Sequence, residues 1–256
     1  MIDLVCSLSL LGVAALAALG YCAVVLARGV QHFARVERDG GSALLGKGVM
    51  TAGYWAYRPV GEALARVGVS PDAITLGSLA LGVVAALSVA SGHFGVAAVF
   101  ATAAAVGDGL DGLVARATGR VSEGGEVLDA VADRYQEFAF LSGVAVALRE
   151  SVIGMTLALA ALCGSMMTSY VSARAASLRV EIPRGEMRRP ERAVYLTAGV
   201  ALAPIAEALA KRANASPEWT NAPIVLSLLV VGVVANVSAV RRLIALRHLL
   251  AERRRP

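Results

Sequence analysis

The sequence predicts an all-α integral membrane protein: a six-transmembrane-helix core with an interfacial amphipathic helix and an extra N-terminal transmembrane helix. Apolar residues make up 57% of the 256-residue chain and charged residues only 17%, whereas soluble domains have about 45–50% and about 25%. Long apolar runs also recur, and about 20 such residues span the hydrocarbon core of a bilayer. The alternative, a soluble bundle of buried helices, fits these run lengths poorly.

The N-terminal part predicts one span, at about residues 4–27, followed by a polar stretch to Ser70. The span lacks Lys or Arg before Arg28, unlike a cleaved signal peptide, so we expect a retained anchor. Residues 53–67 mix Tyr and Trp with Arg and Glu, which favours a helix lying at the membrane interface over a soluble linker helix. The expected division is an N-terminal anchor and linker, 1–52, and a membrane domain, 53–256.

The next helix begins at Ser70 and Pro71, because Ser is a preferred N-cap and Pro suits the first helical position. Its span and the five after it are expected at about residues 73–90, 94–116, 126–148, 152–175, 193–209 and 224–240. The connections predict a loop with Gly119, Gly124 and Gly125, a basic surface loop at 174–192, and a turn at 211–223.

The formal net charge of +5 is unevenly distributed. Basic residues gather at 28–66, 174–192 and 241–255, and the positive-inside rule predicts that these segments face the cytoplasm. Seven spans from a translocated N-terminus satisfy this rule. We therefore expect a multi-pass protein of the inner (cell) membrane whose active site faces the cytoplasm, in contact with the lipid bilayer and with no nucleic acid as partner.

Two pairs of aspartates flank the loop between the third and fourth spans. Asp108 and Asp111 are three residues apart, and Asp129 and Asp133 are four apart, so each pair shares one face of its helix. A short connection makes the two helices antiparallel neighbours. Ionisable groups near membrane depth are costly unless they pair, bind a cation or do chemistry. The pattern indicates an oxygen-rich site suited to Mg²⁺ or Mn²⁺.

The acids belong to a longer motif, Asp108-x2-Asp111-Gly112-x2-Ala115-Arg116-x8-Gly125-x3-Asp129-x3-Asp133. This motif resembles the signature of the CDP-alcohol phosphotransferases (CDP-alcohol phosphatidyltransferases) at every fixed position. Within that family the chain is most similar to the phosphatidylinositol-phosphate synthases. The resemblance covers a six-helix core from about Gly53 onward, and the first span is a departure from it.

The resemblance implies metal-dependent transfer of a phosphatidyl group from CDP-diacylglycerol, or of a related CDP-alcohol, to an alcohol acceptor with release of CMP. It also implies two Mg²⁺ or Mn²⁺ ions per active site and a homodimer. The metal ligands it implies are Asp108, Asp111, Asp129 and Asp133, and Asp133 is also the implied catalytic base. The implied nucleotide-binding residues are Gly112, Ala115, Arg116, Gly125, Asp72 and Thr75.

The acceptor is expected to be an inositol phosphate, because residues 169–175 and 188–192 resemble their counterparts in the phosphatidylinositol-phosphate synthases. Arginine suits bidentate phosphate recognition, and the candidates for an acceptor pocket are Arg134, Arg174, Arg189 and Arg192. The alternative is that these arginines follow membrane topology and bind lipid headgroups. Glycerol 3-phosphate or another alcohol is the competing acceptor. A membrane cation transporter that uses the acids as its pathway is the alternative of another class.

Overall fold

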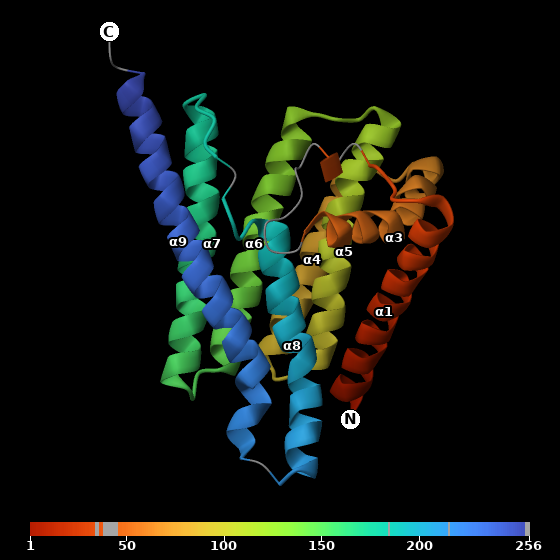
Figure 1. Cartoon of the computed structure of the whole chain (residues 1–256), viewed down its shortest axis with the longest axis vertical. Coiled ribbons are helices and arrows are strands. Elements are labelled where there is room, and N and C mark those ends of the chain that lie inside the picture. The colour runs from red at the N-terminus through yellow and green to blue at the C-terminus, as the bar shows by residue number, and fades with distance from the viewer. Residues whose placement is uncertain (34–35, 38–45, 184, 215, 254–256) are drawn as a thin grey trace.

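The computed structural model describes residues 1–33, 36–37, 46–183, 185–214 and 216–253. These residues form helices and no strand, as Figure 1 shows. The elements in chain order are α1 (Ile2–Arg28), α3 (Gly46–Val67), α4 (Pro71–Ala90), α5 (Phe94–Thr118), α6 (Glu123–Ala147), α7 (Val152–Ser177), α8 (Arg189–Arg212), the 3₁₀ turn η1 (Pro217–Asn221) and α9 (Ala222–Glu252).

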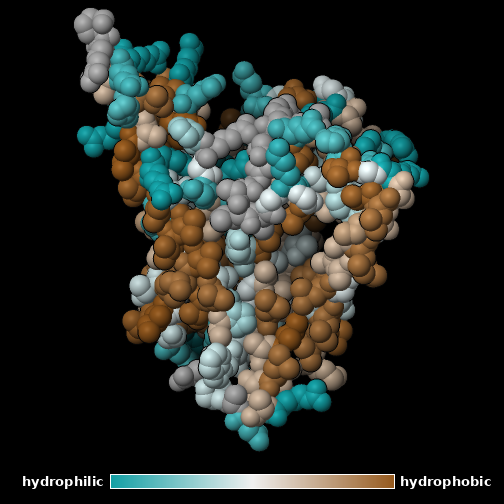
Figure 2. Space-filling view, in the orientation of Figure 1, coloured by the Kyte–Doolittle hydropathy of each residue, from teal (hydrophilic) through white to brown (hydrophobic). Residues whose placement is uncertain are grey.

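The predicted membrane architecture is confirmed. Among the described helices, α1, α4, α5, α7, α8 and α9 with the end of η1 are long and apolar enough to cross a bilayer. Helix α6, the predicted fourth span, is also long and packs against α4 and α7 within the core. It is not among these apolar helices, because its first half carries the ionisable residues of the motif. Figure 2 shows apolar surface around the middle of the molecule and polar surface at both ends.

Helix α3 lies across the bundle instead of along it (Figure 1). It packs on α5, and Gly61 faces Leu113 so closely that a Cβ there would lie 2.6 Å from Leu113 Cδ2. Helix α3 begins at Gly46, earlier than the predicted start at residue 53. The glycines of its first turn weaken the helical signal in the sequence. Its crosswise position fits an interfacial helix beside the ends of α5 and α6.

Serine caps set the starts of three core helices. Ser70 Oγ accepts from Ala73 N at 3.2 Å, Ser122 Oγ from Gly125 N at 3.1 Å, and Ser151 Oγ from Gly154 N at 3.1 Å. The predicted start at Ser70 and Pro71 is therefore confirmed. The predicted loop with Gly124 and Gly125 is wrong in extent, because the Ser122 cap starts α6 at Glu123 and includes both glycines in its first turn.

Two other helix limits also differ from the prediction. Helix α8 begins at Arg189, so the basic segment expected as a loop to residue 192 supplies its first turn; the Glu191 carboxylate accepts from Arg188 N at 2.8 Å and caps that turn. Helix α9 continues to Glu252 instead of ending near residue 240. Its last turns pack on the end of α7, where Leu246 contacts a small cluster with Val171 and Ala175.

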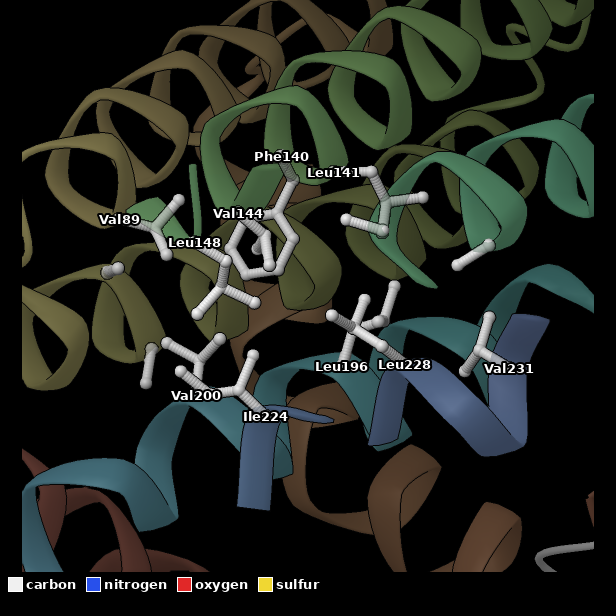
Figure 3. Close-up of a cluster of buried hydrophobic side chains, with 14 of the residues drawn as sticks. Val89, Phe140, Leu141, Val144, Leu148, Leu196, Val200, Ile224, Leu228 and Val231 are labelled. Carbon is white, nitrogen blue, oxygen red and sulfur yellow. The ribbon is translucent and has the colours of Figure 1, made fainter. Parts of the chain in front are cut away.

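The hydrophobic core joins α4, α6, α8 and α9 (Figure 3). Phe140, Leu141 and Val144 of α6 pack there against Leu196 and Leu228 from α8 and α9. The α6 residues of this cluster follow directly after the polar first half of the helix. The same helix is therefore anchored by close packing at one end, which leaves its other end with a fixed position for its acidic side chains.

Candidate active site

Three aspartates from α5 and α6 converge as the sequence predicts. Asp108, Asp111 and Asp129 each bring a carboxylate oxygen to within 4.8 Å of the others. Asp111 is buried, and Asp108 and Asp129 are partly buried. Carboxylates this close repel one another unless a positive charge lies among them. The geometry is therefore that of a cation site.

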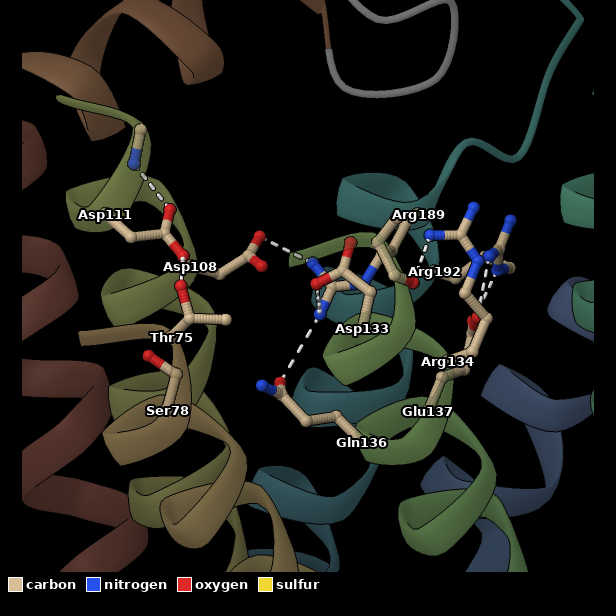
Figure 4. Close-up of polar contacts among 12 residues, drawn as sticks. Thr75, Ser78, Asp108, Asp111, Asp133, Arg134, Gln136, Glu137, Arg189 and Arg192 are labelled. Carbon is tan, nitrogen blue, oxygen red and sulfur yellow. Dashed lines mark hydrogen bonds and ion pairs between the residues drawn. The ribbon is translucent and has the colours of Figure 1, made fainter. Parts of the chain in front are cut away.

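Asp111 is held in place from two sides. Thr75 Oγ1 of α4 donates a 2.7 Å hydrogen bond to Asp111 Oδ2, and the backbone N–H of Gly112 donates to Asp111 Oδ1 at 2.5 Å. Thr75 and Asp111 are each only 5% exposed. Figure 4 shows both side chains at one side of the cluster. Thr75, which the resemblance implied as a nucleotide contact, thus also orients a candidate metal ligand.

Arg189, the first residue of α8, lies between Asp108 and Asp133 (Figure 4). Its Nη1 donates to Asp108 Oδ2 at 2.5 Å, and its Nη2 lies 2.8 Å from Asp133 Oδ1. Nη2 also donates to Gln136 Oε1 at 3.3 Å. The arginine predicted for the acceptor pocket therefore contacts the acids directly in this structure.

The carboxylate oxygens of this cluster are suitable ligands for a divalent cation. Asp129 Oδ1 and Asp133 Oδ1 are buried oxygens without a hydrogen-bond donor, since the close approach of Arg189 to Asp133 lacks hydrogen-bond geometry. A buried carboxylate oxygen left without a donor is expensive. Hard oxygen ligands of this kind are those that Mg²⁺ and Mn²⁺ prefer. Asp108, Asp111, Asp129 and Asp133 are the residues that would hold such ions.

The predicted nucleotide residues lie around the ends of α4, α5 and α6. A Cβ at Gly125 would lie 3.1 Å from Ser122 Oγ and 3.6 Å from Asp72 Oδ1, so Asp72 is beside the start of α6. A Cβ at Gly112 would lie 3.2 Å from Arg116 Nη1, so the guanidinium of Arg116 folds back along α5. Ala115, between them, is partly buried. Small residues at these positions keep the backbone accessible to a ligand.

The other predicted acceptor arginines have different surroundings. Arg192 is 2% exposed, and its Nε and Nη2 donate to the two carboxylate oxygens of Glu137 at 2.5 and 2.7 Å. Arg134 Nη1 donates to the carbonyl of Ala130 within its own helix. Arg174 is exposed on the last turns of α7. Of the four, the structure brings Arg189 into contact with the acids.

Sequence reasoning missed three polar residues that contact the start of α8 or the segment just before it. Glu137 continues the spacing of Asp129 and Asp133 by one more turn of α6, so helical periodicity could have found it. Gln136 contacts Arg189. Arg242 of α9 donates to Ser172 Oγ at 2.8 Å and to the Glu186 carbonyl at 3.3 Å. Arg242 lies in a segment that the sequence indicated only as a basic tail, so no signal placed it here.

A cavity adjoins the cluster on the side of the apolar core. It encloses about 520 Å³ with its open mouth and lies between α4, α5, α6 and α8. Its polar lining residues are Gln136, Glu137, Arg189 and Thr197. The remaining lining residues are Gly82, Ala85, Ala101, Ala104, Ala105, Phe140, Ala193 and Leu196. A charged site therefore continues into an apolar space within the membrane region.

This arrangement has counterparts among known proteins. A model of the CDP-alcohol phosphatidyltransferase family matches residues 68–237. A phosphatidylinositol phosphate synthase of Cutibacterium acnes is 31% identical over 200 residues, which cover 76% of this chain and 94% of that synthase. The chain belongs to the CDP-alcohol phosphatidyltransferase family.

Two further relatives support the assignment. An archaetidylinositol phosphate synthase of Methanothermobacter thermautotrophicus is 34% identical over 134 residues, 52% of this chain and 67% of that enzyme. The crystal structure of the Mycobacterium tuberculosis phosphatidylinositol phosphate synthase with CDP-DAG bound has a TM-score of 0.63 and 25% identity, and the match covers 74% of this chain and 92% of that one. The protein is thus a membrane-embedded, metal-binding CDP-alcohol phosphotransferase of phospholipid biosynthesis, which favours an enzyme over the cation transporter.

Proposed function

We propose that this protein transfers the phosphatidyl group of CDP-diacylglycerol to an inositol phosphate and releases CMP. The observation that carries the proposal is the convergence of Asp108, Asp111 and Asp129 beside Arg189. Arg189 also lines the cavity between α4, α5, α6 and α8. The choice of acceptor is supported by the relatives, which are named phosphatidylinositol or archaetidylinositol phosphate synthases. The choice of donor is supported by the related synthase crystallised with CDP-DAG.

In the proposed reaction, a hydroxyl oxygen of the acceptor attacks the phosphorus that carries the diacylglycerol. The bond from that phosphorus to the bridging oxygen breaks, and the bonding electrons leave with CMP. Asp133 accepts the hydroxyl proton. The four aspartates would hold two divalent cations, and these would neutralise negative charge on the diphosphate. We propose that the cytidine nucleotide binds beside Gly112, Ala115, Arg116, Gly125, Asp72 and Thr75.

Positive side chains around the acids support a phosphorylated acceptor. Arg189 contacts the acids, Arg134 is one residue from Asp133, and Arg174 ends the neighbouring α7. We add Arg242, because its guanidinium donates to Ser172 Oγ, two residues before Arg174, and to the Glu186 carbonyl, and its Nε is buried without a partner. The nitrogens of Arg192 already have protein partners. We therefore propose that Arg192 supports the acceptor pocket indirectly, through its ion pair with Glu137.

The proposal includes the setting of the enzyme. We infer an inner-membrane protein with residues 1–52 as anchor and linker, residues 53–256 as the catalytic domain, and a homodimer as the assembly. A cytoplasmic active site is supported by charge, because Arg174 lies in the last turn of α7, and Arg241 and Arg247 lie in the second half of α9. Both helices run toward the end of the bundle where α5 joins α6 (Figure 1). Chemical cross-linking in native membranes tests the dimer.

An acceptor screen tests the proposed function. Full-length protein in detergent, with CDP-diacylglycerol and Mg²⁺, is given inositol phosphate, glycerol 3-phosphate or inositol in parallel while CMP is measured. Fastest release with inositol phosphate is expected. A preference for glycerol 3-phosphate would instead identify that acceptor, and no CMP with any acceptor would contradict the proposal. Asp133→Asn should abolish turnover and keep nucleotide binding; turnover near the wild-type rate would remove Asp133 as the base.

A further inference from the structure

Arg189 contacts two of the carboxylates that a divalent cation needs. Its two terminal nitrogens reach Asp108 on α5 and Asp133 on α6, at 2.5 and 2.8 Å. We propose that Arg189 competes with a divalent cation for Asp108 and Asp133: it neutralises them before a cation binds and leaves them when one does. The inference rests on the metal site of the proposed function and adds an order of binding to it.

Arg189 occupies one oxygen of each carboxylate, Asp108 Oδ2 and Asp133 Oδ1. Mg²⁺ sits about 2.0–2.1 Å from its oxygen ligands, and the guanidinium nitrogen is already 2.5 Å from Asp108 Oδ2. A cation that bridged these two oxygens would place a second positive group against the guanidinium. Their repulsion is strong in a partly buried site, where screening is weak. The guanidinium and a cation therefore compete for these two oxygens.

Charge balance favours the guanidinium while no cation is bound. Asp108, Asp111 and Asp129 converge here, and Arg189 is a cation in direct contact with Asp108 and with Asp133 beside them. Without it, buried carboxylates would face one another uncompensated, which is strongly unfavourable. Binding of divalent ions reverses this balance, since they neutralise the acids more completely and then repel the guanidinium.

The backbone under Arg189 is fixed, so its release is a side-chain movement. The first turn of α8 is capped by Glu191 and tied to α6 by the Arg192–Glu137 pair. Arg189 also lines the cavity beside Gln136. A released guanidinium therefore stays within reach of the site, where its planar fork can bind a phosphate group. Cation binding would in this way precede and create the arginine contact with the acceptor phosphate.

Metal affinity measured without substrates tests the proposal. Mn²⁺ is titrated calorimetrically into the full-length protein in detergent, with neither donor nor acceptor, at about 0.15 M salt to screen distant charges. The variants are Arg189→Gln, which removes the charge, and Arg189→Lys, which keeps the charge but loses the planar fork. The control is Arg247→Gln, an exposed arginine of α9 that gives the same change in net charge.

We expect Arg189→Gln to bind Mn²⁺ about tenfold more tightly than wild type, because the ion no longer displaces the Arg189 hydrogen bond to Asp108 and its ion pair with Asp133. Arg189→Lys should also bind more tightly, and Arg247→Gln should match wild type. If Arg189 acts only through its positive charge, Arg189→Lys should bind Mn²⁺ with the affinity of wild type. That result would overturn the proposal. Unchanged or weaker binding by Arg189→Gln overturns it as well.

The structure of the wild-type protein with Mn²⁺ gives an independent answer, including the case in which the variants do not fold. Arg189 withdrawn from Asp108 and Asp133 is expected. Arg189 still within hydrogen-bond distance of both, with Mn²⁺ bound, overturns the proposal. Failure of the proposed function has a separate signature: the affinities change as expected, but no acceptor yields CMP.

Discussion

Arg192 of α8 and Glu137 of α6 form a buried ion pair in which two guanidinium nitrogens meet two carboxylate oxygens. The two distances are 2.5 and 2.7 Å, and the side chains are 2% and 9% exposed. Nη1 of Arg192 donates to the Met187 carbonyl at 2.8 Å and to Thr168 Oγ1 at 3.2 Å. The pair fixes the start of α8 against α6, and so determines where Arg189 meets the acids.

Glu137→Ala should strongly destabilise the protein. Removing one partner of a buried pair leaves an uncompensated charge, at a cost of about 3–5 kcal/mol. Thermal unfolding in detergent measures the change, and Glu137→Gln, which keeps an acceptor oxygen, should fall between Ala and wild type. The control is Glu207→Ala: Glu207 pairs with Lys211 at the surface, where a pair is worth about 1 kcal/mol or less. Equal effects at both sites would contradict the importance of the buried pair.

Thr75→Val should weaken metal binding. The threonine hydroxyl donates to Asp111 Oδ2 at 2.7 Å, with both side chains buried. Groups that hydrogen-bond to metal ligands typically change affinity by about 10–100-fold when removed. The Mg²⁺ concentration for half-maximal CMP release should therefore rise, while Thr75→Ser, which keeps the hydroxyl, stays near wild type. If Ser and Val behave alike, the hydroxyl does not act through Asp111.

The spans were predictable because their signals are local. Apolar runs located the crossings, and Ser70 with Pro71 located a helix start. The limits that the sequence missed depend on tertiary packing: α9 continues because Leu246 packs on the end of α7 and Arg253 donates to the Leu178 carbonyl at 3.2 Å. Hydropathy does not record such contacts, and Arg241, Arg242, Arg247 and His248 interrupt the apolar residues of this segment.

The acidic cluster was predictable for a different reason. Spacings of three and four on helices joined by a short loop determine which side chains meet, so Asp108, Asp111 and Asp129 converge as expected. The partners of the arginines were not predictable. Whether Arg189 reaches the acids and Arg192 reaches Glu137 depends on the rotation of α8 against α6, and two residues in the same basic segment thus have different surroundings.

Gly143→Ala should destabilise the contact between α4 and α6. A Cβ at Gly143 would lie 2.5 Å from the carbonyl oxygen of Ala86 and 2.7 Å from Val89 Cγ1, so the helices would have to separate. Gly77→Ala, on the exposed face of α4 with nothing within 4 Å, is the matched control. It should be neutral or stabilising by up to about 1 kcal/mol, because Ala is the better helix former. A Gly143→Ala protein as stable as Gly77→Ala would show that the interface can adapt.

The first helix is attached to the core through Asp3. Asp3 Oδ1 accepts from the backbone N–H groups of Gly95 and Val96 at 2.8 and 3.2 Å, and so caps α5 from another helix. His93 Nδ1 lies 3.3 Å from Asp3 Oδ2. A side chain at Gly95 would collide with the backbone of Asp3. The contact has no counterpart in the sequence motifs, because the two segments are 92 residues apart.

Asp3→Ala should therefore loosen α1 and lower stability by about 0.5–2 kcal/mol, the usual cost of losing an N-cap. Asp3→Asn keeps an acceptor oxygen and should lose less. Thermal unfolding gives the energy, and protease accessibility of the polar segment after α1 reports whether the helix has moved from the core. CMP release should persist, since Asp3 caps the end of α5 opposite the acids. If Asp3→Ala abolishes activity while the protein remains folded, α1 takes part in the reaction and is more than an anchor.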